Sequence, residues 1–212
     1  MLRAASASAS SAARLLWRTR ALPRAHARCL SSAGGLSIPG TPRALADITK
    51  LELLQDEPPG RIAAIWEQYH AERPGLAGEA IDAAEHELLV QRATESPQFV
   101  LPIRREGGHF MLFSQYAAAQ SMFALTFLED YQRSADAAQP WASVHVFDDL
   151  LTTKAVALLR AETVPERLTK AEAEHLLLLL RRYYATDNYD KAWTFNHAAR
   201  HFDFDAFLRG CP

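Results

Sequence analysis

Five short apolar runs between residues 99 and 159 constrain the fold of this chain more than any other feature. Each run has the length of one strand, and all but the last are rich in β-branched and aromatic residues; they are Phe99–Ile103, Phe110–Tyr116, Met122–Leu128, Val144–Phe147 and Ala155–Leu159. The link between the last two contains Asp148, Asp149 and Thr152, and it is too short for a crossover helix, because a parallel return takes a dozen residues or more. These two strands must therefore pair antiparallel.

The first two runs have the features of a β-hairpin at the edge of a sheet. Gly107 and Gly108 lie between them, and glycine tolerates the positive φ angles that tight hairpin turns require. Pro102 interrupts the first run and has no N–H to donate, so this strand belongs near an edge or a strand end. The middle of the chain therefore predicts an antiparallel sheet with residues 99–103 as an edge strand.

Helical periodicity precedes these strands. Three helices are expected there: one within residues 45–54, an amphipathic one over residues 61–72, and one that carries Ile81, Ala84, Leu88 and Gln91 and ends before Pro97.

A longer helix follows the strands. Thr169 and Glu172 form a Thr-x-x-Glu capping box, in which each side chain accepts from an otherwise unpaired amide. Leu176 to Tyr184 then continue an apolar stripe that Leu178 and Leu179 widen. Residues 193–208 are expected to be irregular with one short helix. The whole pattern predicts a single α+β domain, a mainly antiparallel β-sheet flanked by N-terminal and C-terminal α-helices.

The N-terminus has the composition of a mitochondrial presequence. The first 46 residues contain seven arginines, no lysine and no carboxylate, and alanine and serine fill most of the rest. A disordered basic tail is the alternative that the same composition allows. The Arg28-Cys29-Leu30-Ser31 sequence predicts cleavage after Leu30. We therefore expect residues 1–46 to be a transit peptide and disordered linker, and residues 47–212 to be the domain.

The expected domain is acidic. Seven of the 23 basic residues and none of the 25 acidic ones lie before residue 47, which leaves a formal charge of −9 on the remainder. Nucleic-acid binding draws on basic patches, so nucleic acid is a poor partner. The longest aliphatic run, Leu176–Leu180, is far shorter than the roughly 20 residues that cross a bilayer. We expect no membrane insertion and a free domain that is monomeric.

Candidate chemistry is sparse. His197 and His201 are four residues apart, with Asp203 close behind, which is a spacing that metal sites use. A zinc protease requires Glu beside the first His, and Ala198 holds that place. A small metal-dependent hydrolase using these three residues is kept as an alternative. The main expectation is a binding protein with no catalysis, no metal and no cofactor.

Several segments together resemble one family, the mitochondrial ATP synthase F1 complex assembly factor 1 family. They cover about residues 60 to 208 and occur in the expected order: Ile65 to His70, Phe99 to Ile103 with Gly107-Gly108, Phe123 to Tyr131, Pro140 with His145 and Lys154, Leu158 to Glu162, Leu176 to Tyr184, and Phe195-Asn196 with Phe202-Asp203-Phe204. The chain departs from the pattern at Ala199 and Arg200, where a proline is expected.

The resemblance implies a stoichiometric chaperone of the mitochondrial matrix. Such a protein binds the unassembled beta subunit of the ATP synthase F1 sector, prevents its aggregation and promotes assembly of the F1 hexamer. A ring subunit has apolar faces meant for its neighbours, and bare faces of that kind aggregate. A non-catalytic scaffold of an inner-membrane complex is the other alternative.

The same segments supply candidate contact residues. Most aromatic residues in such segments belong to the core. The polar subset expected at the surface, in contact with the partner, is Tyr131, Arg160, Glu162 and Asn196.

Overall fold

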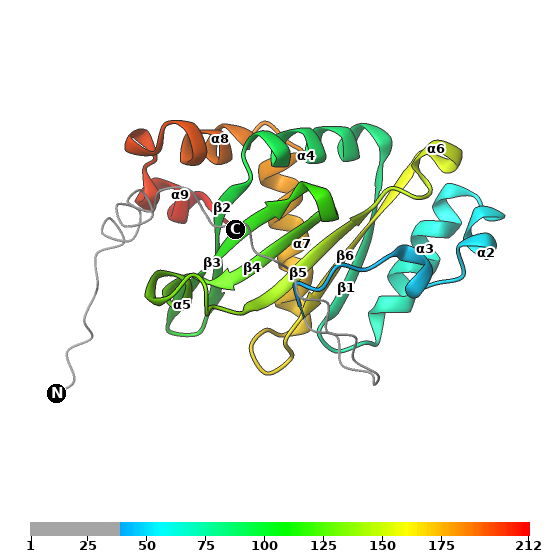
Figure 1. Cartoon of the computed structure of the whole chain (residues 1–212), viewed down its shortest axis with the longest axis horizontal. Helices are drawn as coiled ribbons and strands as arrows, with labels where there is room; N and C mark the ends of the chain where they lie inside the picture. The colour runs from blue at the N-terminus through cyan, green and yellow to red at the C-terminus, as the bar shows by residue number, and fades with distance from the viewer. Residues whose placement is uncertain (1–38) are drawn as a thin grey trace.

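The computed structural model describes residues 39–212, and the expected transit peptide and its cleavage site lie almost entirely outside them (Figure 1). Its centre is one six-stranded sheet in the order β1-β6-β5-β4-β3-β2, with all neighbours antiparallel. The strands are β1 (Leu76–Asp82), β2 (Gln98–Arg105), β3 (Gly108–Ala117), β4 (Met122–Phe127), β5 (Pro140–Phe147) and β6 (Val156–Thr163). The α+β class, the antiparallel β5–β6 pair and the position of β2 at an edge are confirmed.

Helices cover both faces of this sheet. One face is covered by α7 (Lys170–Tyr184), together with α4 (Ala83–Glu95), α8 (Tyr189–His197) and α9 (Phe204–Gly210). The opposite face is covered by η1 (Leu45–Asp47), α2 (Leu51–Gln55), α3 (Pro59–Ala71) and α5 (Leu128–Arg133). Figure 1 shows α7 behind the sheet and α3 at the right, beside β1. The remaining short elements are η2 (Ala118–Gln120), α6 (Leu151–Lys154) and η3 (Ala199–His201).

Strand β6 shows why the sheet is buried on both faces. Leu159 and Ala161 belong to the main core beneath α7, whereas Val156 and Leu158 belong to a second cluster with Trp66 of α3. Alternate residues of a strand point to opposite faces, so one apolar strand supplies both clusters. Every residue of β6 is buried.

The local signals read from the sequence are confirmed at two places. Gly107 has φ of 87° at the β2–β3 turn. Thr169 and Glu172 form the expected capping box at the start of α7, with the Thr169 hydroxyl accepting from Glu172 N at 3.2 Å.

The amphipathic helix predicted over residues 61–72 is confirmed as α3, whereas the other two upstream helices differ from the prediction. Ile81 was expected in a helix but lies in β1, and the helix begins after Asp82, whose carboxylate accepts from Glu85 N at 2.8 Å. That N-cap fixes where α4 starts, since it accepts a hydrogen bond from a first-turn amide that has no partner within the helix. The single helix expected within residues 45–54 is two pieces, η1 and α2, because Lys50 between them has an extended backbone.

The C-terminal region is also more regular than predicted. Two helices, α8 and α9, replace the irregular segment with one helix. Asp203 caps α9 by accepting from Ala206 N at 2.9 Å. Within residues 39–212, no helix has both the length and the apolar character needed to cross a membrane.

Candidate functional site

A group of buried charged side chains lies on the α3 face of the sheet. Arg160 and Glu162 project from β6 beside His145 of β5, which pairs with Arg160 in the β5–β6 register. Arg160 Nε lies 2.8 Å from the Glu162 carboxylate, and the two residues are 6% and 0% exposed. A buried charge is tolerated when it is paired, so each residue holds the other in place.

The residues that cover this group come from far away in the sequence. Residues 39–45, called the strap below, cross in front of β5 and β6 (Figure 1). His145 Nε2 lies 3.0 Å from the Thr41 carbonyl oxygen, and Arg43 Nε lies 3.3 Å from the Glu162 carboxylate. Leu45 is buried in the cluster beneath α3. Packed structure therefore begins upstream of residue 47.

The contact with Thr41 fixes the tautomer of His145. A carbonyl oxygen only accepts, so Nε2 must carry the proton and Nδ1 of a neutral ring does not. Burial lowers the pKa of His145, and the nearby charges of Arg160 and Arg43 act in the same direction, against Glu162 and the Thr41 carbonyl. The ring is therefore a neutral hydrogen-bonding group.

Helix α3 lies close against the sheet beside the charged group. Trp66 Nε1 donates to the Leu159 carbonyl at 2.9 Å, and the His70 ring lies 4.4 Å from the Trp66 ring. Gly78 of β1 permits this approach, since a Cβ there would overlap His70 Nδ1 and lie 2.8 Å from Trp66 Nε1. Burial lowers the pKa of His70 to about 4.

The other two predicted contact residues lie elsewhere. Tyr131 of α5 packs 4.5 Å from the Phe113 ring, and burial raises its pKa. Asn196 of α8 is half-buried, and its side-chain amide pairs with both main-chain polar groups of Gln98. The structure thus brings only Arg160 and Glu162 together.

The expected surface position of these residues is wrong for Tyr131, Arg160 and Glu162, which are all buried. Strand β6 reads as an alternating strand with one polar face, but that face is covered by α3 and the strap. Whether any of the four residues contacts a partner stays a prediction.

The alternative metal residues do not form a ligand set. His197 Nε2 lies 3.2 Å from the buried Ser96 hydroxyl, and its ring packs against Trp193. The Asp203 carboxylate is engaged as the cap of α9. Among residues 39–212, no group of three or more His, Cys, Asp or Glu side chains is arranged to hold a metal ion.

Comparison with known proteins shows the family to which this chain belongs. The model of the family described as ATP11 protein matches residues 23–205, which is most of the sequence. The chain belongs to the ATP11 protein family. The resemblance drawn from the sequence segments is therefore confirmed.

Curated relatives of this ATP11-family chain include animal and fungal proteins. The human protein named ATP synthase mitochondrial F1 complex assembly factor 1 is 26% identical over 165 residues, covering 76% of this chain and 49% of the relative. The mouse protein of the same name is 25% identical over 165 residues, covering 76% and 50%. The Schizosaccharomyces pombe protein named Protein atp11, mitochondrial, is 25% identical over 143 residues, covering 65% and 50%. The chain spans about half the length of the curated relatives it matches.

Several large apolar side chains of the ATP11-family fold are exposed. They are Leu53, Leu88, Leu178 and Trp193, with Leu178 47% and Trp193 42% exposed. The sequence predicted that Leu178 would widen the buried stripe of α7; it points outward instead. Tryptophan is one of the residues that most often anchor protein–protein contacts, so Trp193 is the stronger candidate of the four.

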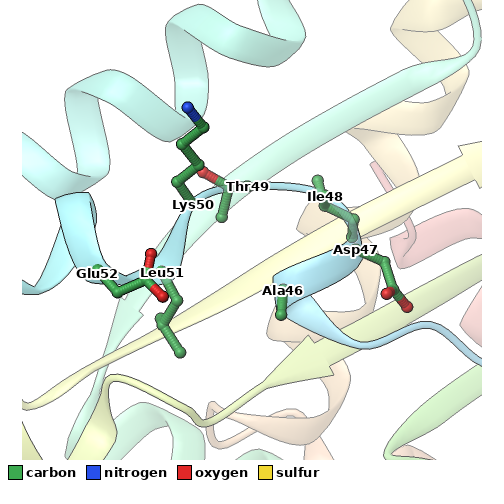
Figure 2. A pocket seen from close by; sticks show the side chains of 7 residues that line it. All are labelled: Ala46, Asp47, Ile48, Thr49, Lys50, Leu51 and Glu52. Atoms are coloured by element: carbon green, nitrogen blue, oxygen red, sulfur yellow. The ribbon is translucent and has the colours of Figure 1, made fainter.

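A shallow hollow lies next to α2. Figure 2 shows its lining, which comes from the single segment Ala46 to Glu52. Charged and apolar side chains alternate around it, and the Asp47 carboxylate accepts from Ala44 N at 3.2 Å. The hollow has no convergent set of reactive groups, so it suggests no active site.

Sequence reasoning missed His145 as a member of the buried group and the half-buried Arg43 as part of the strap that covers it. Arg43 was counted with the arginines of the N-terminal segment, and the one local sign that separates it is the Pro39-Gly40 turn before it. His145 lies inside a resembling segment but gives no local sign of burial.

Proposed function

We propose that this chain is a stoichiometric chaperone of the mitochondrial matrix that binds the unassembled beta subunit of the ATP synthase F1 sector. It prevents aggregation of that subunit and promotes assembly of the F1 hexamer, without catalysis and without a cofactor. The observation that carries the proposal is membership of the ATP11 family, whose human and mouse relatives are named as F1 complex assembly factors.

The physical requirement is to cover an apolar interface temporarily. A stable protein–protein contact covers about 800 Å² on each partner. The chaperone must bind less tightly than the final neighbour in the ring, so that the neighbour displaces it by competition. A few aromatic or arginine anchors supply most of such an affinity.

Two sets of residues are proposed to take part. Leu178 of α7 and Trp193 of α8 are exposed anchors on the face of the sheet that α7 covers. Arg160 and Glu162 contribute from the opposite face, as part of the groove considered below. Tyr131 and Asn196 are kept as predicted contact residues. Tyr131 is buried and Asn196 is half-buried, so an indirect contribution through the fold is the simpler mechanism for both.

The proposal is tested by mixing the purified chain with isolated beta subunit. We expect a one-to-one complex in size-exclusion chromatography and suppression of beta-subunit light scattering on warming. The alpha subunit serves as the matched control and should form no such complex. Equal binding to both subunits, or no binding to beta, would refute the proposal.

Localisation is tested separately. Replacing Arg14, Arg18 and Arg20 with Glu removes positive charge from the expected presequence. The tagged variant should stay in the cytosol, whereas wild type should resist protease in isolated mitochondria and fractionate with the matrix. Normal matrix levels of the variant would contradict the targeting prediction.

A further inference from the structure

We infer that the strap is a displaceable occupant of a groove, and that the groove binds an extended segment of the partner subunit with an arginine followed two residues later by an apolar side chain. This inference rests on the proposed function. It names a second contact surface, on the sheet face opposite α7.

The floor of the groove is a block of four polar residues on two neighbouring strands. Ser143 and His145 of β5 pair in register with Glu162 and Arg160 of β6. All four are buried, and all four project to the same face, because each is two residues from the next on its strand. Burying so much polar surface costs free energy unless the covering chain provides partners.

The strap shows what kind of chain fits. It offers a main-chain carbonyl to His145, a guanidinium to Glu162 and an apolar side chain to the cluster beneath α3, from Thr41, Arg43 and Leu45. Thr41, Pro42 and Ala44 are exposed, whereas Arg43 is half-buried and Leu45 is buried, so the side chains that face the sheet are those of Arg43 and Leu45. Alternation of this kind is how an extended segment presents every second residue to a surface.

The strap satisfies the groove only in part. The Ser143 hydroxyl and His145 Nδ1 are buried and have no hydrogen-bond partner among residues 39–212. Buried polar groups left unpaired cost free energy, so a segment that adds a donor to His145 Nδ1 and a partner to Ser143 gains over the strap. Gly40 also holds a φ of 88° against Pro140, a conformation that few residues adopt.

The strap can leave without disturbing the sheet. It precedes every strand and every α-helix of the domain in the sequence, so no strand has to move when it lifts. Glu162 keeps Arg160 at 2.8 Å when Arg43 departs. A covered groove keeps the polar block out of water until the partner segment arrives, and exchange of one extended segment for the other opens the surface.

A reversible disulfide tests whether the strap must move. An ideal Cβ at Gly40 lies 3.6 Å from Pro140 Cβ, within the range that a disulfide spans. The φ of 88° at Gly40 strains a cysteine there, so the oxidised and reduced states of the same variant are compared. We would make Gly40→Cys/Pro140→Cys in the full chain with Cys29→Ser, and confirm the bond by mass spectrometry. Capture of beta subunit should be at least ten-fold weaker when the protein is oxidised and should return on reduction. Each single Cys variant is a control, and its capture of beta subunit should be the same under oxidising and reducing conditions.

A second variant loosens the strap instead of locking it. Arg43→Ala removes one of its anchors, so capture of beta subunit should strengthen several-fold, and a labelled peptide of residues 39–47 should bind this variant. The same peptide with glutamate at the Arg43 position is the control and should not bind. A purely structural strap would instead give weaker capture in step with lower stability.

The outcomes separate the two proposals. If wild type captures beta subunit, and neither the disulfide nor Arg43→Ala changes capture, the groove inference is overturned and the proposed function stands. If wild type captures no beta subunit while Arg43→Ala binds the peptide, the groove stands as a peptide site and the proposed partner is wrong. A reduced double variant that forms strap-exchanged dimers instead of capturing the subunit would assign the groove to a second copy and also overturn the inference.

Discussion

Asn196 pairs its side-chain amide with both main-chain polar groups of Gln98, at the start of the edge strand β2. The amide Nδ2 donates to the Gln98 carbonyl, and Oδ1 accepts from Gln98 N at 3.1 Å. The side chain thus takes the place of a neighbouring strand at this point. An exposed strand edge is a template for unwanted pairing, and Pro102 removes a further donor from β2.

Replacing Asn196 with Ala should therefore destabilise the domain. Two partly buried main-chain groups lose their partners, which we expect to lower the free energy of unfolding by about 1–3 kcal/mol. Urea unfolding measures the change. Asn188→Ala is the control, because its amide donates to the exposed Thr186 hydroxyl and accepts from Lys191 Nζ at 3.4 Å without pairing any main-chain group, and it should change stability by less than about 0.5 kcal/mol. Weaker beta-subunit capture without a loss of stability would instead make Asn196 a contact residue.

Arg160→Ala should lower the free energy of unfolding more than the replacement of any exposed arginine by alanine. It removes the closest positive charge from the buried Glu162 carboxylate, and breaking a buried pair costs about 3–5 kcal/mol when one charge is left behind. Arg43 remains at 3.3 Å, so we expect the lower end of that range. Thermal and urea unfolding measure it, with the exposed Arg200→Ala as the control. An unchanged stability for Arg160→Ala would show that this pair is not part of the packed core.

Gly78→Ala should destabilise the domain through a single methyl group. The new Cβ would overlap the His70 ring and lie 2.8 Å from Trp66 Nε1, so α3 would have to move away from β1. Overpacking of this kind costs about 1–3 kcal/mol. Gly60→Ala is the matched control in the first turn of α3, where nothing lies within 4 Å of the added Cβ. That change should be neutral or stabilising by up to about 1 kcal/mol. Equal effects of the two substitutions would contradict the close contact.

The domain should lose stability as the pH falls from 6.5 toward 4. Burial lowers the pKa of His70 from 6.5 to about 4, so in this window the unfolded chain binds a proton that the folded protein refuses. Stability therefore rises with pH through the window, and between pH 7 and pH 5 the contribution of His70 changes by about 2 kcal/mol. Urea unfolding at both pH values measures it. His70→Phe should reduce the pH dependence, whereas the exposed His201→Phe should preserve it. A pH dependence that survives His70→Phe unchanged would assign the effect to other groups.

Local signals in the sequence predicted much of the architecture. The Gly107-Gly108 hairpin and the Thr169–Glu172 capping box depend only on neighbouring residues, so they could be read directly. Strand β1 could not, because its residues Ala77, Gly78 and Ala80 are small and its partner β6 lies about 80 residues later. The pairing of β1 with β6 is a long-range interaction. It holds Ile81 in a strand although the local spacing of apolar residues favours a helix there.

The buried charged group could not be predicted for a related reason. Arg160 and Glu162 alternate with apolar residues along β6, as charged residues on a solvent-facing strand do. They are buried by α3 and the strap, and the sequence of β6 itself does not indicate either contact. The buried stripe of α7 was predicted correctly, except that Leu178 points outward from it.

The position of the strap also sets an order of events in folding. Arg43 and Glu162 are 119 residues apart, so the strap, which is synthesised before the sheet, finds its place only after the sixth strand has been made. Contacts between such distant residues form late, since a long loop must close first. An incomplete chain would carry a loose N-terminal segment and an open sheet face. Docking of the strap is therefore a mark of completion, by which a chain that has placed its last strand differs from one that has not.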